Sequence, residues 1–137
     1  MQDPDLMVAM ALITNSVHSI ASVTEEPVAL LLNWRLYQVR DNKGSRQRHL
    51  VGCVQGGSGG RVTSALVTID LTSATAVTSS GRMYRLKGPT GFDDDADYVW
   101  KVWQRINLST HVRDVTRALV KVLDRSQTHA YVASCGL

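Results

Sequence analysis

The chain has 137 residues, of which 44% are hydrophobic and 20% are charged, and its formal net charge is +3. These values are typical of a single globular domain over residues 1–137 and argue against a disordered, fibrous or membrane-spanning protein. The two cysteines, Cys53 and Cys135, are too few for a disulfide framework. We expect two reduced thiols in a cytoplasmic protein, with a single Cys53–Cys135 bridge as the alternative.

An apolar run, Leu6–Ile13, stands near the start of the chain. Its eight residues are too few to cross a membrane. As the core of a secretion signal it would follow Lys or Arg, whereas Asp3 and Asp5 precede it. The run therefore predicts a buried strand or short helix at the edge of the domain, and a cytoplasmic location.

The next part of the chain, from about residue 16 to residue 86, predicts an antiparallel meander of four to six strands. Alternating or β-branched runs separated by turn residues carry this prediction. Gly52 inside one run indicates a bulge or a close backbone approach. The last two runs form either one strand bent at Gly81 or a tight pair. The runs are Ser16–Thr24, Ala29–Arg40, Arg48–Gln55, Arg61–Asp70, Ala76–Ser80 and Arg82–Leu86.

The period changes after Lys87–Gly91, where Pro89 cannot donate to a strand ladder. Residues 93–106 predict a helix with an apolar stripe that includes Trp100 and Trp103 at three- and four-residue spacing. The acid cluster Asp93–Asp97 begins this helix, where unpaired N–H groups favour negative charge. A second helix is predicted over about 110–124, capped by Ser109 or Thr110. Residues 129–137 suggest a final edge strand. The predicted fold class is α+β, with the sheet packed against two C-terminal helices.

Several sequence patterns resemble catalytic or metal-binding motifs but lack the flanking elements or the residue spacing that those motifs require. The string Gly56–Gly60 matches G-x-S-x-G around Ser58, but a strand follows it where a nucleophile elbow requires a helix. The acid cluster Asp93–Asp97 lacks the spacing of a calcium loop. The histidines and cysteines show neither C-x-x-C nor H-x-x-x-H spacing. We therefore predict no catalytic residues, no metal and no cofactor, and classify the protein as a non-enzyme.

The bases are unevenly distributed, which makes them the best candidate for a binding surface. Residues 1–34 contain no Lys or Arg, whereas residues 35–87 contain nine bases against two acids. Such asymmetry is typical of a surface for nucleic acid or an acidic protein. Tyr37 and Tyr84 are the aromatic residues of these strands expected to point outward for stacking. The alternative is a solvated polar face. The candidate binding residues are Arg35, Tyr37, Arg40, Arg46, Arg48, Arg61, Arg82, Tyr84 and Arg85.

We expect this basic face to be exposed, so that reversing the charges of Arg46, Arg61 and Arg82 together weakens binding and leaves folding intact. The contrary outcome, unfolding of that variant, would mean that these arginines pair with Asp93–Asp97.

Part of the chain resembles a group of small, uncharacterised bacterial proteins encoded on plasmids, phages and other mobile elements. The resemblance covers about residues 34–106, and its most specific parts are an S-G-R-x-Y-x-L-x-G string and a D-A-x-Y-V-W helix start. The strings are HLVG (His49–Gly52), GRVTSALVTID (Gly60–Asp70), TSSGRMYRLKGPTG (Thr78–Gly91) and DADYVWKVW (Asp95–Trp103). The resemblance implies mobile-element accessory biology in a bacterial cytoplasm, such as inhibition of host defence by an anti-CRISPR-type protein. It transfers no functional residue.

Three functions remain open on the sequence. The first is a non-catalytic interaction or inhibitor protein that binds a macromolecular partner through its surface. The second is a nucleic-acid-binding accessory factor that uses the basic sheet face. The third is a small enzyme of unknown chemistry.

Overall fold

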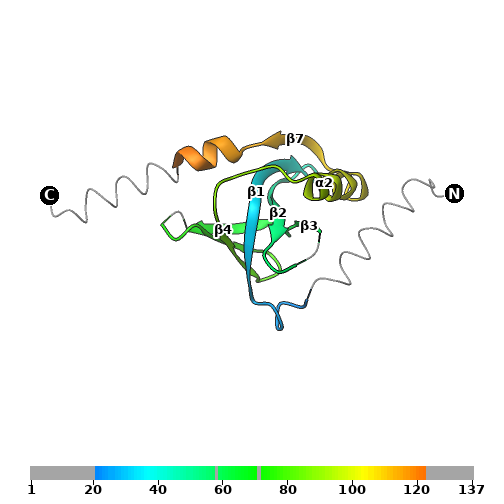
Figure 1. Ribbon diagram of the computed structural model, residues 1–137. Coiled ribbons are helices and arrows are strands. Elements are labelled where there is room, and N and C mark those ends of the chain that lie inside the picture. Colours follow the sequence, from blue (N-terminus) through cyan, green and yellow to red (C-terminus); the bar gives the residue numbers. More distant parts are fainter. Residues whose placement is uncertain (1–20, 58, 71, 123–137) are drawn as a thin grey trace.

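The computed structural model describes residues 21–57, 59–70 and 72–122 (Figure 1). Its seven strands form one sheet of order β3-β2-β1-β6-β5-β4, and β7 pairs with β1. A helix, α2, spans Asp94–Ile106, and a second helical segment covers residues 116–122. The strands are β1 Val28–Arg40, β2 Arg46–Val54, β3 Gly60–Val62, β4 Leu66–Asp70, β5 Thr75–Thr78, β6 Met83–Leu86 and β7 Thr110–Asp114.

The α+β class is therefore correct, but the sheet is mixed and not purely antiparallel. The first half of β1 pairs in parallel with β6, with Val28 opposite Met83. The other pairs, including β1–β2, β4–β5 and β5–β6, are antiparallel. The parallel pair joins the end of the meander to its longest strand, a long-range contact that local sequence patterns do not encode.

β1 is the central strand of the sheet, and it bends at Asn33. The backbone there takes a positive φ of 48°, and the register with β2 shifts between Leu32 and Arg35. A bulge reverses the facing of the residues that follow it. Before the bend Leu31 faces the larger core, and after it Leu36 does so.

The larger core lies inside the curve of the sheet. The sheet curls until β4, at one end of the strand order, contacts β2 near the other (Figure 1). Partly buried residues of β4 and of the 116–122 segment, among them Leu66 and Leu119, pack against this core. The core residues are Ala29, Leu31, Trp34, Leu36, Leu50, Val54, Ala76 and Tyr84.

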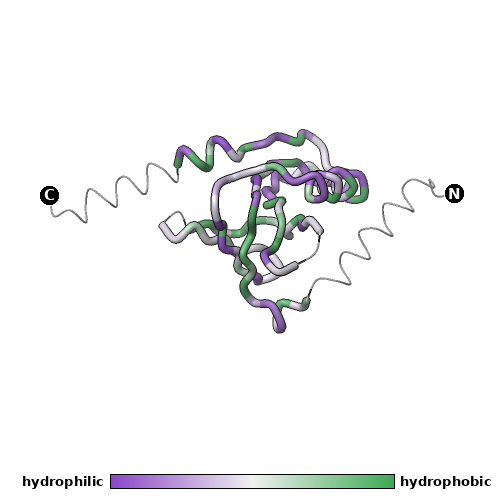
Figure 2. The backbone as a smooth tube through the Cα atoms, in the orientation of Figure 1, coloured by the Kyte–Doolittle hydropathy of each residue, from purple (hydrophilic) through white to green (hydrophobic). Residues whose placement is uncertain are grey.

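The smaller core lies on the opposite face, where α2 covers β1, β2 and β3. Trp100 is 2% exposed and packs with Val39 and Val51. The helix approaches β3 so closely that a Cβ on Gly60 would lie 2.2 Å from the Cα of Ala96, so only glycine fits there. Figure 2 shows hydrophobic and hydrophilic residues mixed along α2, as expected of a helix with one face on the sheet.

The predicted start of α2 is confirmed. The Asp93 side chain accepts a hydrogen bond from the backbone N–H of Ala96 at 2.9 Å and so caps the helix. Asp94, Asp95 and Asp97 occupy the first turn, where the helix dipole favours them. Trp100 is buried and Trp103 half-buried, as the stripe predicted. Val102, which the stripe left out, is buried as well.

The prediction of a helix from about 110 is wrong at its start. Residues 110–114 form β7 on the free edge of the second half of β1. Helix follows only at residue 116, where the Asp114 carboxylate accepts the N–H of Thr116 at 2.9 Å. The Thr116 hydroxyl in turn accepts the N–H of Leu36 at 2.9 Å. The open edge of β1 thus captures residues whose local pattern favours a helix.

The remaining element predictions have mixed outcomes. Gly52 does allow a close backbone approach, since a Cβ there would lie 2.6 Å from the carbonyl oxygen of Leu32. The two runs around Gly81 form a tight antiparallel pair. Residues 21–24 form no strand. The predicted strand Arg61–Asp70 is divided into β3 and β4. The predicted element Leu6–Ile13, residues 16–20, the predicted strand 129–137 and Cys135 lie outside the described residues.

Replacing Trp100 with Ala should lower the free energy of unfolding by about 3–5 kcal/mol, because it empties the smaller core. Tyr98→Ala on the exposed side of the same helix, where the side chain is 54% exposed, should change it by less than about 0.5 kcal/mol. Urea denaturation of both variants measures this. Equal losses would show that α2 is not held by its tryptophan stripe.

Candidate functional site

The strands β2, β1 and β7 lie side by side near the β1–β2 turn, and arginines lie in register across them. Arg48 of β2 is opposite Gln38 of β1, which is opposite Arg113 of β7. Two residues further along these strands, toward the β1–β2 turn, Arg46 is opposite Arg40. Residues opposite one another, and residues two apart on one strand, share a face of a sheet. We call Arg40, Arg46, Arg48 and Arg113 the arginine cluster.

The arginine cluster is exposed and lacks carboxylate partners within the described residues. All four side chains are exposed, and none of the four ion pairs of this part of the chain includes them. Arg40 donates to the carbonyl of Gly44 at 2.9 Å, and the Nε of Arg48 donates to Gln38 at 3.2 Å. These bonds orient the guanidinium groups without neutralising them.

The turn between β1 and β2 adds to this charge. Lys43 at its tip is exposed. Asp41 is the one acid of the turn, and its Oδ1 accepts the backbone N–H groups of Lys43 and Ser45 at 2.9 and 2.8 Å. Asp41 is one acid against the five bases Arg40, Lys43, Arg46, Arg48 and Arg113, so this region keeps a strong local positive charge.

Arg113 belongs to this cluster although sequence reasoning missed it. The helix predicted from about residue 110 placed Arg113 away from the basic strands. The usable signal was the β-branched run around Val112 next to Thr110, which is compatible with an edge strand. Only the pairing of β7 with β1 brings Arg113 into the same row as Arg48, with Gln38 between them.

Two of the predicted surface arginines, Arg61 and Arg82, are instead buried. Arg61 is 9% and Arg82 6% exposed. Both bind the same Oε2 of Glu26, at 2.9 and 3.3 Å respectively. Arg82 also donates to the carbonyl oxygens of Glu26 and Ala21. The two arginines therefore tie residues 21–26 to β3 and to the turn before β6, and they contribute no binding surface. Their partner is Glu26 and not the acid cluster Asp93–Asp97.

Arg35 has a structural role on the opposite face of β1, where it lies across from Val51 of the smaller core. It forms a 3.0 Å ion pair with Asp114 of β7 and donates from Nε to the carbonyl of Gly91 at 3.0 Å. Its guanidinium carbon also lies 5.6 Å from the ring centre of Phe92. Arg35 thus joins β1 to β7 and to the loop before α2, which removes it from the free bases of the surface.

The other candidates lie elsewhere. Tyr84 is 2% exposed and belongs to the larger core, so it does not point outward. Tyr37 is half-buried and stacks on Trp100 at a ring distance of 4.8 Å. Arg85 is exposed on β6, opposite Leu30 and Thr75, and lies on a different part of the sheet from the arginine cluster.

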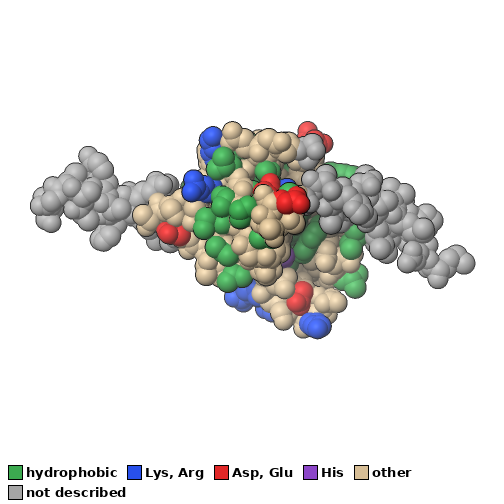
Figure 3. Space-filling model, turned by 90° about the horizontal axis from the view of Figure 1, so that it is seen from below, with side chains coloured by type: hydrophobic (Ala, Val, Ile, Leu, Met, Phe, Trp, Pro, Cys, Tyr) green, Lys and Arg blue, Asp and Glu red, His purple; other side chains and the backbone are tan. Residues whose placement is uncertain are grey.

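Arg85 stands beside an apolar row that crosses the outer side of the sheet. Val28, Met83 and Val77 lie opposite one another on β1, β6 and β5. Val28 is 43% exposed, and the other two are partly exposed. We call Val28, Met83 and Val77 the apolar row. Hydrophobic side chains are also exposed near the middle of the face of the molecule shown in Figure 3.

Two titratable groups near α2, Cys53 and His49, have shifted pKa values. Burial, followed by the nearby Asp93, raises the pKa of the Cys53 thiol to about 11, so it stays protonated at neutral pH. Burial also lowers the pKa of His49, although its hydrogen bond to the carbonyl of Thr63 acts in the opposite direction. In the described ranges no three His, Cys, Asp or Glu side chains come together to hold a metal ion.

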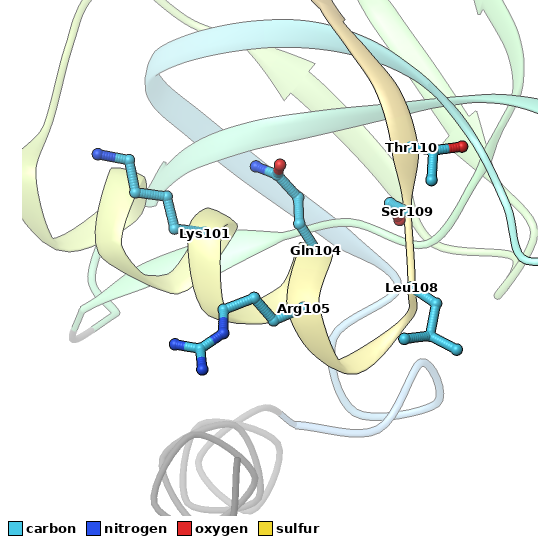
Figure 4. A pocket seen from close by; sticks show the side chains of 6 residues that line it. All are labelled: Lys101, Gln104, Arg105, Leu108, Ser109 and Thr110. Carbon is cyan, nitrogen blue, oxygen red and sulfur yellow. The ribbon is translucent and has the colours of Figure 1, made fainter. Parts of the chain in front are cut away.

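A cavity of about 560 Å³ is an open groove beside the C-terminal half of α2. Lys101, Arg105 and Gln104 line it from the helix (Figure 4). The charged ends of Lys101 and Arg105 point away from the strand opposite (Figure 4), and Lys101 is paired with Asp97 at 2.9 Å. The polar groups of this groove therefore do not converge on a common point.

Comparison of the chain with protein-family models, with curated proteins and with solved structures finds no match. Neither helix, as far as the structure follows it, is long and apolar enough to cross a bilayer.

Glu26→Gln should lower the free energy of unfolding by about 3 kcal/mol, because it leaves two buried guanidinium groups without a counter-charge. The neighbouring exposed Glu25→Gln provides the matched control and should change stability by less than about 0.5 kcal/mol. Urea denaturation measures both. Equal stability of the two variants would contradict the structural assignment of Arg61 and Arg82.

The stability of the protein should fall as the pH drops below about 6.5, the ordinary pKa of histidine. Because the pKa of His49 is lowered in the folded state, the unfolded chain binds the proton first and is favoured by acid. His49→Gln should reduce this fall, and the exposed control His111→Gln should retain it. Urea denaturation at about pH 7.5 and about pH 5.5 measures the difference. A fall that is identical in all three proteins would exclude His49 as its source.

Proposed function

We propose that this protein is a non-catalytic nucleic-acid-binding protein whose arginine cluster holds the phosphate backbone. The observation that carries the proposal is the set of four exposed arginines from three strands, on one face and without carboxylate partners among the described residues. Arginine presents a planar fork of donors that matches phosphate oxygens.

The spacing of the cluster supports a backbone ligand. Neighbouring strands lie about 4.8 Å apart, and residues two apart on one strand are separated by about 6.6 Å. The four arginines therefore occupy two rows across three strands, with Arg48 and Arg113 on either side of Gln38 and Arg46 opposite Arg40. Successive phosphates can lie over these rows. Gln38 between Arg48 and Arg113, and Thr110 opposite Arg40, add neutral hydrogen-bonding groups. Polar, positively charged surfaces are typical of nucleic-acid interfaces.

The second candidate function is the binding of a protein partner through the apolar row. Exposed apolar residues in register are typical of protein interfaces, and Arg85 supplies a charged rim. The arginine cluster by itself fits this function less well, since Gln38 at its centre and the turn beside it offer no exposed apolar anchor.

The resemblance to mobile-element proteins supports a bacterial, plasmid- or phage-encoded setting for either function. In a bacterial cytoplasm, such a protein would act as an accessory factor of a plasmid or phage, or as an anti-CRISPR-type inhibitor that competes for nucleic acid or for a defence protein.

The variant Arg46→Gln, Arg48→Gln, Arg113→Gln should weaken binding to a short single-stranded oligonucleotide. It should also flatten the dependence of log affinity on log salt by about 2, because each lost phosphate contact removes about 0.7 from the slope. Fluorescence anisotropy at about 50 and about 200 mM salt measures this.

The matched control is Arg85→Gln, Arg105→Gln, Arg117→Gln, which removes the same charge from exposed positions outside the cluster. This control should keep most of the dependence of log affinity on log salt. Absence of oligonucleotide binding in the wild-type protein, together with capture of a protein partner that Val77→Lys abolishes, would replace this function with the second candidate.

A further inference from the structure

A second cavity, of about 320 Å³, lies between the β1–β2 turn and the C-terminal end of α2. Its volume is at the lower end of the range for small-ligand sites. Three carboxamides, one carboxylate and one indole surround it. The lining residues are Asp41, Asn42, Gln47, Trp103, Ile106, Asn107, Leu108 and Ser109, and we call it the amide pocket.

The aromatic wall of the amide pocket is held rigidly. Trp103 is half-buried and stacks on Trp100, with ring centres 5.5 Å apart and planes 20° apart. The His49 ring packs against Trp103 at 4.4 Å. A ring fixed by such neighbours loses little conformational entropy when a flat ligand packs on its remaining surface.

The polar groups of the pocket are also held in place. Asp41 is fixed by two backbone N–H groups of its turn. The Gln47 amide lies 3.2 Å from Nε2 of His49. The Asn107 amide donates to the carbonyl of Trp103 at 2.9 Å. A rigid aromatic wall surrounded by oriented amides and a carboxylate suits a flat, apolar ring with polar edges.

The pocket adjoins the arginine cluster around the end of the sheet. Asp41 and Asn42 stand in the chain between Arg40 and Lys43. Gln47 lies between two arginines of β2 and faces the opposite side of the strand, toward α2. A backbone held by Arg40 and Lys43 at the turn therefore passes the mouth of the pocket.

We propose that the amide pocket takes one unstacked nucleobase of a single-stranded nucleic acid. This proposal rests on the proposed function, because the arginine cluster supplies the backbone contacts. A base paired inside a duplex cannot reach a recessed ring, so the pocket confers a preference for single strands. Stacking on an aromatic side chain tolerates different bases, and the amides and Asp41 contact the base edge.

The test compares a short single-stranded oligonucleotide with an abasic strand of the same length, which keeps the phosphates and lacks the bases. The normal strand should bind about tenfold more tightly, the scale of one base–aromatic stack. It should also quench tryptophan fluorescence. Because Trp34 and Trp100 are only 4% and 2% exposed, quenching within the described residues reports on Trp103.

A filling variant localises the effect. Ser109 lines both the amide pocket and the groove beside α2. Ser109→Leu should abolish both the quenching and the preference for the normal strand, whereas Gln104→Leu, which changes the groove alone, should retain both. Ser79→Leu on the exposed β5–β6 turn is the matched control and should retain both.

The outcomes separate this proposal from the proposed function. Equal binding of normal and abasic strands, with the salt dependence of the arginine cluster intact, would overturn the base pocket and leave backbone binding standing. Retention of quenching by Ser109→Leu would overturn it as well. Failure of both strands to bind would overturn the proposed function and the pocket together.

Discussion

The bend of β1 at Asn33 is the constraint on which the rest of the structure depends. A straight thirteen-residue strand would present one set of alternate residues to one side along its whole length. The bulge reverses that alternation, so that Leu31 before it and Leu36 after it face the same core. The first half of β1 can then close the curled sheet through β6, while the second half projects beyond it and receives β7.

The ion pairs of the protein determine which bases are available at its surface. Glu26 holds Arg61 and Arg82, and Asp114 holds Arg35. The Glu26 pairs join the segment before β1 to β3 and to the turn before β6, and the Asp114 pair joins β7 to β1. The bases at the projecting end of β1 and β2 have no such acid among the described residues. Some arginines of residues 35–87 therefore stabilise the fold through ion pairs, and others remain available at the surface.

The projecting end of the sheet carries different chemistry on its two sides. One side presents the arginine cluster, and the other is covered by α2 and contains the stacked rings of Tyr37, Trp100 and Trp103. The β1–β2 turn connects the two sides, with Lys43 exposed and Asp41 in the amide pocket. Charge and a rigid aromatic surface meet at this turn, which is why the proposed backbone and base contacts fall on one small region.

The sequence by itself determined the local elements. The Asp93 cap, the tryptophan stripe of α2 and most strand positions follow from interactions between residues a few positions apart, which leave a periodic pattern in the chain. The basic middle and three members of the arginine cluster were visible from the uneven distribution of bases along the chain.

Only the tertiary structure decided which distant segments meet. The parallel β1–β6 pair, the capture of residues 110–114 as β7, and the burial of Arg61 and Arg82 on Glu26 each join residues far apart in the chain. An arginine in an alternating strand gives the same sequence pattern whether it faces water or a buried carboxylate. A short run such as that around Val112 is compatible with either a helix or a strand. The free edge of β1 and the position of Glu26 settle those choices, because backbone hydrogen bonds and buried charges must be satisfied wherever the fold leaves them open.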